Sequence, residues 1–202
     1  MTITTVTPSL ENSPLVLRLE PIINLTDDQF FEFCQINREL RIERTANREL
    51  LIMSPTGSET GNRNFKLTVQ LGIWVERDGT GIGFDSSSGF KLPNGAERSP
   101  DAAWIKLERW NALTSEQQGK FAPICPDFVV ELRSDCDNLA PLKTKMEEYI
   151  DNGASLGFLI DRKNRDVYIY LPGVGVECLK NPATVSGDPV LPGFVLDLSN
   201  IW

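Results

Sequence analysis

Residues 126–150 read PDFVVELRSDCDNLAPLKTKMEEYI, and this stretch decides the fold class. Its first part is apolar enough for a strand that is buried on both faces. Its second part predicts a helix, with Pro141 near the first position and Gly153 just beyond the end. The apolar segment LGFLID follows at 156–161. A strand, a helix of about a dozen residues and a second apolar strand predict a right-handed βαβ crossover.

The first strand is interrupted by a carboxylate, Glu131. Alternation along the strand places Phe128, Val130 and Leu132 on one face, and Val129, Glu131 and Arg133 on the other. An unpaired buried charge costs several kcal/mol, so a carboxylate there is protonated, paired with a cation or bound to a metal. Two interpretations follow: an ion pair between Glu131 and Arg133 at the strand end, or a metal ligand.

The rest of the chain predicts an α/β fold with the element order αβββαβ. A helix capped by Thr26 and a hairpin around residues 45–48 precede this core. The core would then begin with a helix over about 58–77 and continue with a strand pair formed by GIGFDSSSGFKL and RSPDAAWI around a turn at 93–95. Thr114 or Ser115 would cap a short helix in WNALTSEQQGKF, and DVYIY and VECL would extend or edge the sheet.

Length and composition are those of an ordinary globular chain, with 202 residues, 41% hydrophobic and 24% charged side chains. We expect a loose N-terminal arm over residues 1–20 and a single domain over residues 21–202. MTITTVTPSL lacks the pattern of a signal peptide, and 18 uncharged apolar residues nowhere stand together, so we expect a cytoplasmic protein with no membrane contact. The four cysteines show no ligand spacing and are interpreted as reduced thiols.

Two compositional features limit the kinds of catalytic site and nucleic-acid binding that the chain can have. The chain has no histidine, which excludes Ser-His and Cys-His triads and His-ligated zinc hydrolases. Hydrolytic chemistry would therefore depend on carboxylates, lysine, hydroxyls and hard metal ions. The net charge of -8 argues against non-specific coating of nucleic acid, although it permits a local basic groove.

Two further charged groups stand out beside Glu131. Asp101 lies in SPDAAWI, where Pro100 makes the strand entry an edge or a bend, and its simplest interpretation is a solvated turn acid. The helix after Glu131 carries Lys143 and Lys145. Lys143 has Glu147 four residues on, the spacing of a surface ion pair, whereas Lys145 lies between Leu142 and Tyr149 on the apolar side. Lys145 is therefore the better candidate to bring its ammonium to a strand-end carboxylate.

Four segments together carry a family resemblance: SPTGSETGNRN, GFKLPNGAERSPDAAWI, PDFVVELRSDCDNL and LKTKMEEYIDNGASLGFLID. In this order and spacing, over roughly residues 25–172, the chain resembles the Uma family of putative restriction endonucleases, within the PD-(D/E)XK nuclease superfamily. The resemblance implies a restriction endonuclease-like αβββαβ core, a mixed central sheet flanked by helices. It also implies that Asp101, Glu131 and Lys145 are catalytic, with the lysine displaced from the strand onto the helix. Asp101 and Glu131 would be metal ligands, and Glu59 an accessory metal ligand.

The sequence also departs from the family's pattern. In the superfamily's basic pattern, lysine stands two residues after the second acid, where this chain has Arg133. In the family, a histidine often follows the equivalent of Glu59, where this chain has Thr60. Arginine remains protonated and cannot act as a base, so activity would depend on Lys145.

The expected function is Mg²⁺-dependent hydrolysis of DNA phosphodiester bonds, with Mn²⁺ as a possible substitute. Mg²⁺ prefers oxygen ligands and would relieve the repulsion between two neighbouring carboxylates. One alternative is a noncatalytic nuclease-fold protein for DNA binding or assembly, and another is a paired-carboxylate hydrolase acting on sugars. We also expect a homodimer, because related nucleases commonly cut duplex DNA as pairs. The hairpin and the C-terminal segment LPGFVLDLSNIW look available for packing.

Overall fold

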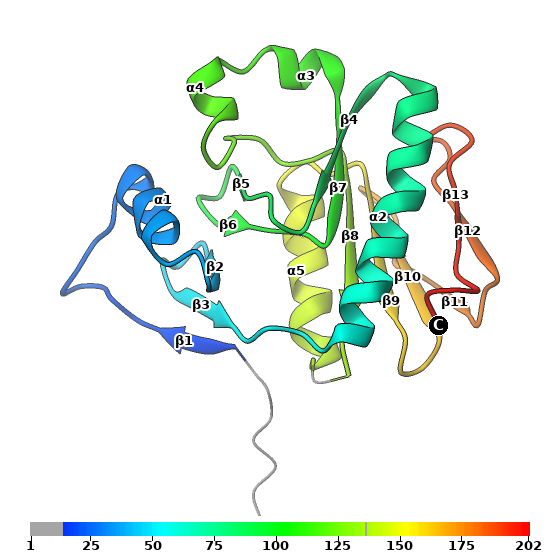
Figure 1. The fold of residues 1–202 in the computed structure, drawn as a ribbon, viewed down its shortest axis with the longest axis horizontal. Helices are drawn as coiled ribbons and strands as arrows, with labels where there is room; N and C mark the ends of the chain where they lie inside the picture. The colour runs from blue at the N-terminus through cyan, green and yellow to red at the C-terminus, as the bar shows by residue number, and fades with distance from the viewer. Residues whose placement is uncertain (1–13, 136) are drawn as a thin grey trace, which may run out of the picture.

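The computed structural model describes residues 14–135 and 137–202. Two larger β-sheets form the body of the molecule, and a small two-stranded sheet of β12 (Thr184–Ser186) and β13 (Val195–Asp197) lies near the C-terminus (Figure 1). In this part of the chain, no helix is long and apolar enough to cross a membrane.

The central sheet has six strands in the order β11-β10-β9-β8-β7-β4. Its strands are β4 (Gly81–Asp85), β7 (Ala102–Lys106), β8 (Phe128–Arg133), β9 (Leu156–Asp161), β10 (Asp166–Tyr170) and β11 (Glu177–Lys180). β8 and β9 pair in parallel and the other neighbours pair antiparallel, so the sheet is mixed. The predicted crossover and the extension of the sheet by 166–170 and 177–180 are confirmed.

Two helices cover the opposite faces of this sheet. Helix α2 (Ser58–Asp78) and the C-terminal segment pack on the face that carries Phe128 and Val130. Helix α5 (Leu139–Asp151) packs on the face that carries Val129. A Cβ at Gly157 would lie 2.4 Å from Met146 Cε, so the glycine lets α5 approach the sheet closely. The order α2, β4, β7, β8, α5, β9 is the predicted αβββαβ core.

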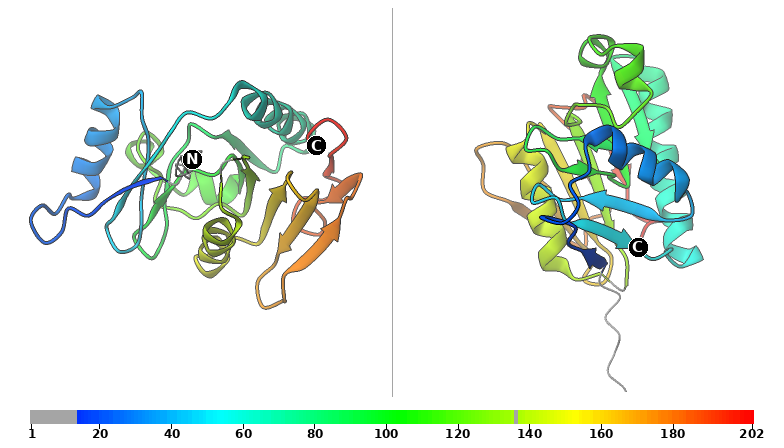
Figure 2. Two further views of the ribbon diagram at one scale, coloured as in Figure 1. Left: turned by 90° about the horizontal axis from the view of Figure 1, so that it is seen from below. Right: turned by 90° about the vertical axis from the view of Figure 1, so that its left-hand side faces the viewer.

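The second sheet has five strands in the order β1-β3-β2-β6-β5. Its strands are β1 (Leu15–Leu17), β2 (Arg41–Arg44), β3 (Leu50–Met53), β5 (Phe90–Lys91) and β6 (Glu97–Arg98). Helix α1 (Asp27–Ile36) lies beside it, capped by Thr26 as predicted (Figure 2). Residues 1–13 of the expected arm lie outside the described residues, whereas residues 15–17 pair with β3.

Residues 90–98 differ from the predicted single strand pair. β4 pairs with β7 of the central sheet, but β5 and β6 form a separate hairpin in the second sheet. The reason is the pairing of β6 with β2, in which Arg44 stands opposite Glu97 and binds it through a buried ion pair. Ser87 donates to Asp85 Oδ1 in the turn that ends β4.

Two smaller expectations also change. The segment 107–118 forms two short helices, α3 (Leu107–Asn111) and α4 (Ser115–Gln118), and Thr114 caps the second. The C-terminal segment was expected to be available for a partner, and this is wrong. Val195 is exposed, but five of the segment's apolar side chains are buried in the chain's own core beside α2, namely Leu191, Phe194, Leu196, Leu198 and Ile201.

Candidate active site

A groove of about 1110 Å³ lies where the two sheets meet. Its walls come from β2 and β3 on one side, and from the start of α2, the ends of β8 and α5 on the other. Asp101, Glu131, Lys145 and Glu59 all line it. The structure therefore places all four residues predicted from the sequence along one groove.

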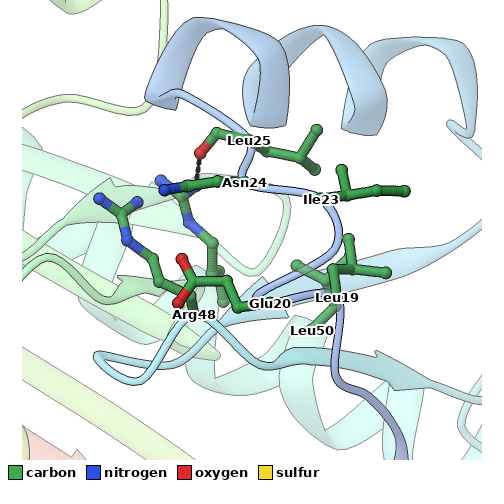
Figure 3. Close-up of a pocket in the computed structure, with 8 residues that line it drawn as sticks. Leu19, Glu20, Ile23, Asn24, Leu25, Arg48 and Leu50 are labelled. Atoms are coloured by element: carbon green, nitrogen blue, oxygen red, sulfur yellow. Dashed lines mark hydrogen bonds between the residues drawn. The ribbon is translucent and has the colours of Figure 1, made fainter.

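A second, much smaller pocket lies between residues 19–25 and the β2–β3 hairpin, and its volume is about 10 Å³ (Figure 3). Arg44 donates across it to the carbonyl of Leu25 at 2.8 Å. A space of this size holds a single water at most. The groove is therefore the better candidate for a substrate site.

Asp101 and Glu131 lie on neighbouring strands at this groove. Asp101 directly precedes β7, and its backbone N–H donates to the carbonyl of Val130 on β8. Its Oδ2 accepts from the N–H of Leu132 at 2.8 Å, so the carboxylate is fixed beside the residue that follows Glu131. Asp101 is only 6% exposed, which does not fit a solvated turn acid.

The other oxygen of Asp101 is held by two side chains. Oδ1 accepts from Arg41 Nη1 at 3.3 Å and from Asn64 Nδ2 at 3.0 Å. Arg41 also donates to the carbonyl of Ser99, and the nearby acids Asp101, Glu43 and Glu131 raise its pKa although burial opposes this. The Oδ1 atom of Asn64 is buried and has no hydrogen-bond partner among the residues that the structure describes.

Glu131 is 4% exposed and contacts the inward lysine of α5. Lys145 Nζ lies 2.7 Å from Glu131 Oε1, and Tyr149 donates its hydroxyl to the same oxygen at 3.2 Å. Burial raises the pKa of Glu131 to about 7; Lys145 opposes this, while the charges of Asp101 and Glu43 add to it. Lys145 thus lies in the groove, as its position between Leu142 and Tyr149 predicts.

Lys145 is shared with a second carboxylate, Glu43 on β2. The Nζ–Oε1 distance is 2.8 Å. Burial would raise the pKa of Glu43, but Lys145, Arg98 and Arg41 lower it to about 2. Burial would also lower the pKa of Lys145, whereas Glu131 and Glu43 raise it, so its amine remains an ammonium at neutral pH.

The sequence-based alternatives for these cations are wrong. Arg133 does not pair with Glu131, since its Nη1 binds both carboxylate oxygens of Asp161 at 2.9 and 3.0 Å. Lys143 does not pair with Glu147, since its ammonium lies 4.0 Å from the centroid of the Tyr168 ring. The helical lysine, not the strand arginine, therefore provides the cation at Glu131.

Glu59 is not gathered with the other acids. Its side chain is 70% exposed and pairs with Arg63 at the first turn of α2. Within residues 14–135 and 137–202, no three Asp, Glu or Cys side chains converge closely enough to hold a metal ion. Two carboxylates, Asp101 and Glu131, thus remain as the predicted acidic pair.

Sequence reasoning missed the residues that β2 and α2 contribute, namely Arg41, Glu43 and Asn64. The sequence does contain one signal for Arg41 and Glu43. Arg41 and Glu43 alternate with Ile42 along a strand, which places both charged side chains on one face. That pattern cannot show which carboxylate or lysine of the other sheet they meet.

Comparisons with known proteins identify the family of this chain and a solved structure with a shared fold. A family model with the printed name Uma2 and the description "putative restriction endonuclease" matches residues 27–199. A solved structure titled a "putative nuclease belonging to DUF820", from Anabaena variabilis ATCC 29413, superposes with a TM-score of 0.69. It is 17% identical and covers 88% of this chain and 97% of its own, which shows a shared fold. Among curated proteins, no sequence matches this chain.

Proposed function

This chain belongs to the Uma2 family of "putative restriction endonucleases", and from this premise we propose that it is a Mg²⁺-dependent endonuclease that hydrolyses DNA phosphodiester bonds. One observation carries the proposal. Two buried carboxylates, Asp101 and Glu131, and the half-buried lysine that pairs with Glu131 line a single groove at the junction of the sheets. The proposed catalytic residues are Asp101, Glu131 and Lys145.

The donor atoms at this place suit a hard divalent ion. Asp101 and Glu131 supply carboxylate oxygens, and Asn64, whose Nδ2 bonds to Asp101, has a buried Oδ1 with no hydrogen-bond partner among the described residues. Mg²⁺ prefers such oxygen ligands and usually keeps several waters, and Mn²⁺ accepts the same set. Asp101 and Glu131 would hold the ion; an accessory contribution from Glu59 stays a prediction, because its carboxylate is exposed. When bound, the ion supplies polarisation of the phosphate and lowers the pKa of a water.

The chain's own cationic residues have separate proposed roles at the site. Lys145 stays protonated, so it acts as a charge-stabilising and water-orienting group, not as a base. Arg41, at the groove and 36% exposed by its side chain, is placed to contact a phosphate oxygen when Asp101 turns to an ion. These cations and Arg98 each pair with an acid at the groove, and its lining carries more acids than bases, so a bound divalent ion would have to supply the remaining attraction for a phosphate.

A noncatalytic nuclease-fold protein is the second candidate, and a specific observation favours it. Both acids already have cationic partners: Arg41 pairs with Asp101, and Lys145 pairs with Glu131. Such a site is neutralised without any metal ion, as a relic site would be. Metal binding separates the two candidates, because a relic site holds Mg²⁺ or Mn²⁺ no better than a carboxylate-depleted variant does.

A homodimer is a further proposal. The C-terminal segment is buried and no longer supports a dimer. The proposal therefore rests on the β2–β3 hairpin and on related nucleases, which commonly cut duplex DNA as pairs. A cytoplasmic location and the single domain over residues 21–202 likewise remain proposals.

The experiment that tests the function measures metal binding and cleavage together. Purified protein is incubated with supercoiled, linear and single-stranded DNA in Mg²⁺, in Mn²⁺ and with EDTA, while calorimetry follows ion binding. Asp101→Asn and Glu131→Gln should each remove ion binding and cleavage, because the metal ion loses one of its two charged ligands. Asp135→Asn is the matched control, since this 70% exposed acid lines the same groove. Wild-type protein that neither binds an ion nor cuts any of the substrates would overturn the proposal.

A further inference from the structure

Glu43 contacts the candidate lysine from outside the αβββαβ core. It lies on β2 of the second sheet, and its Oε1 accepts from Lys145 Nζ at 2.8 Å. The two residues are 102 positions apart in the chain. The ammonium of Lys145 therefore has two carboxylate partners, one from each sheet, and only Glu131 is assigned a role above.

Glu43 is held in place without help from Glu131. It is 2% exposed, and its Oε1 also accepts from the backbone N–H of Ser99 at 3.1 Å. Its Oε2 accepts from Arg98 Nη1 at 3.1 Å, and Arg98 is in turn held by Glu148 at 2.6 Å. A carboxylate fixed on both oxygens keeps one geometry whatever Glu131 binds.

The two partners of Lys145 differ in what else they face. Glu131 would bind a divalent ion, and that ion would compete with the ammonium of Lys145 for the carboxylate of Glu131. Glu43 meets the cations Lys145 and Arg98 and bonds to the backbone beside Asp101. Its contact with Ser99, two residues before Asp101, also ties the aspartate's segment to the lysine.

We propose that Glu43 is a positioning residue, which anchors the ammonium of Lys145 in the groove independently of Glu131. Its purpose rests on the proposed nuclease function, because the anchor matters for catalysis only if Glu131 turns to a metal ion. The anchor itself is a contact that can be measured in protein without metal or DNA.

The test measures how fast Lys145 reacts with an amine reagent, by mass spectrometry at one fixed pH. Lys180, whose side chain is 73% exposed, is the internal reference. In Glu131→Gln the labelling of Lys145 should remain within about 2-fold of wild type, because Glu43 still holds it. In the double variant Glu43→Gln/Glu131→Gln it should rise about 10-fold or more, the scale of losing a hydrogen bond to a charged group.

The matched control is Glu148→Gln, combined with Glu131→Gln. Glu148 pairs with the same Arg98 but makes no contact with Lys145 among the described residues, so labelling should match that of Glu131→Gln alone. If Glu43→Gln fails to fold, Glu43→Asp withdraws the carboxylate by one methylene and keeps its charge. It should also raise labelling in the Glu131→Gln background. Equal, strong labelling in Glu131→Gln and in the double variant would overturn the anchor.

Metal and activity measurements separate this proposal from the nuclease proposal. In Mg²⁺ or Mn²⁺, Glu43→Gln alone should expose Lys145 to labelling, while ion affinity stays within about 2-fold. The turnover number should fall about 10-fold or more with little change in KM. If labelling follows the prediction but wild type binds no ion and cuts no DNA, the anchor stands and the nuclease proposal fails. If cleavage is metal-dependent but Glu43→Gln changes neither labelling nor turnover, the anchor fails and the nuclease proposal stands.

Discussion

Replacing Arg133 with methionine should destabilise the fold and spare the candidate site. Arg133 is the last residue of β8, two residues after Glu131. Its Nη1 binds Asp161 at 2.9 and 3.0 Å, and its Nε donates to the carbonyl of Asp137 at 3.0 Å. None of these groups belongs to the proposed catalytic set. Arg133→Met is therefore expected to act on stability alone.

The magnitude follows from what the substitution leaves behind. Asp161 is 0% exposed, and removing one partner of a buried ion pair costs about 3–5 kcal/mol because the other charge stays buried. Asp161 keeps hydrogen bonds from Asn164 at 2.8 Å and from the N–H of Lys163 at 3.2 Å. We therefore expect the lower end, a loss of about 3 kcal/mol in the free energy of unfolding.

Urea denaturation at pH 7 measures this loss, and cleavage per folded molecule should change less than about 2-fold. The double variant Arg133→Met/Asp161→Asn should recover much of the stability, because the orphaned charge is gone. Arg18→Met is the control, since Arg18 pairs with Glu49 at 2.6 Å and is 74% exposed, so this loss should stay within about 1 kcal/mol. A variant that keeps its stability but loses cleavage about 100-fold would refute the reasoning and make the strand position the functional one.

Three other predictions follow from the site. Lys145→Ala should keep ion binding but slow cleavage by about 10² or more, as measured by single-turnover kinetics, because a charge-stabilising group is lost. Burial raises the pKa of Glu131 from an ordinary 4.5 to about 7, so the metal-free folded state binds the extra proton between these values. Its stability should fall by about 3 kcal/mol as pH rises through that window, and Glu131→Gln should abolish the fall in urea titrations. Glu43, with a pKa lowered to about 2, titrates below this window. Light scattering at micromolar concentration should give the mass of a dimer, and a monomer would contradict the proposed pairing.

The αβββαβ core could be predicted because its signals are local. The apolar runs and the turn glycine after α5 each lie within a few residues of the element they define. The caps of two helices outside the core, Thr26 and Thr114, are local signals of the same kind. The inward lysine was also predictable, since Lys145 lies three residues after Leu142 and four before Tyr149. These patterns depend on the period of a helix or a strand and need no knowledge of distant partners.

The contribution of the second sheet could not be predicted in this way. Arg41 and Glu43 reach the groove only because β2 pairs with β6, and this pairing depends on the ion pair between Arg44 and Glu97. Those residues are 53 positions apart, and nothing in either segment specifies the other. A strand of four residues with three charges resembles an exposed hairpin arm. Its burial is a consequence of the tertiary structure.

A lysine carried on the helix is physically reasonable at this place in the fold. The βαβ crossover lays α5 over β8, and Gly157 allows the close approach. Lys145 and Tyr149, four residues apart on one helical face, then reach the same oxygen of Glu131, Oε1. Glu131 lines the groove, and no hydrogen bond from the described residues reaches its Oε2. A strand lysine would approach along β8, where Arg133 instead turns away to Asp161. The helical lysine thus leaves one carboxylate oxygen of Glu131 available for a cation that Asp101 could share.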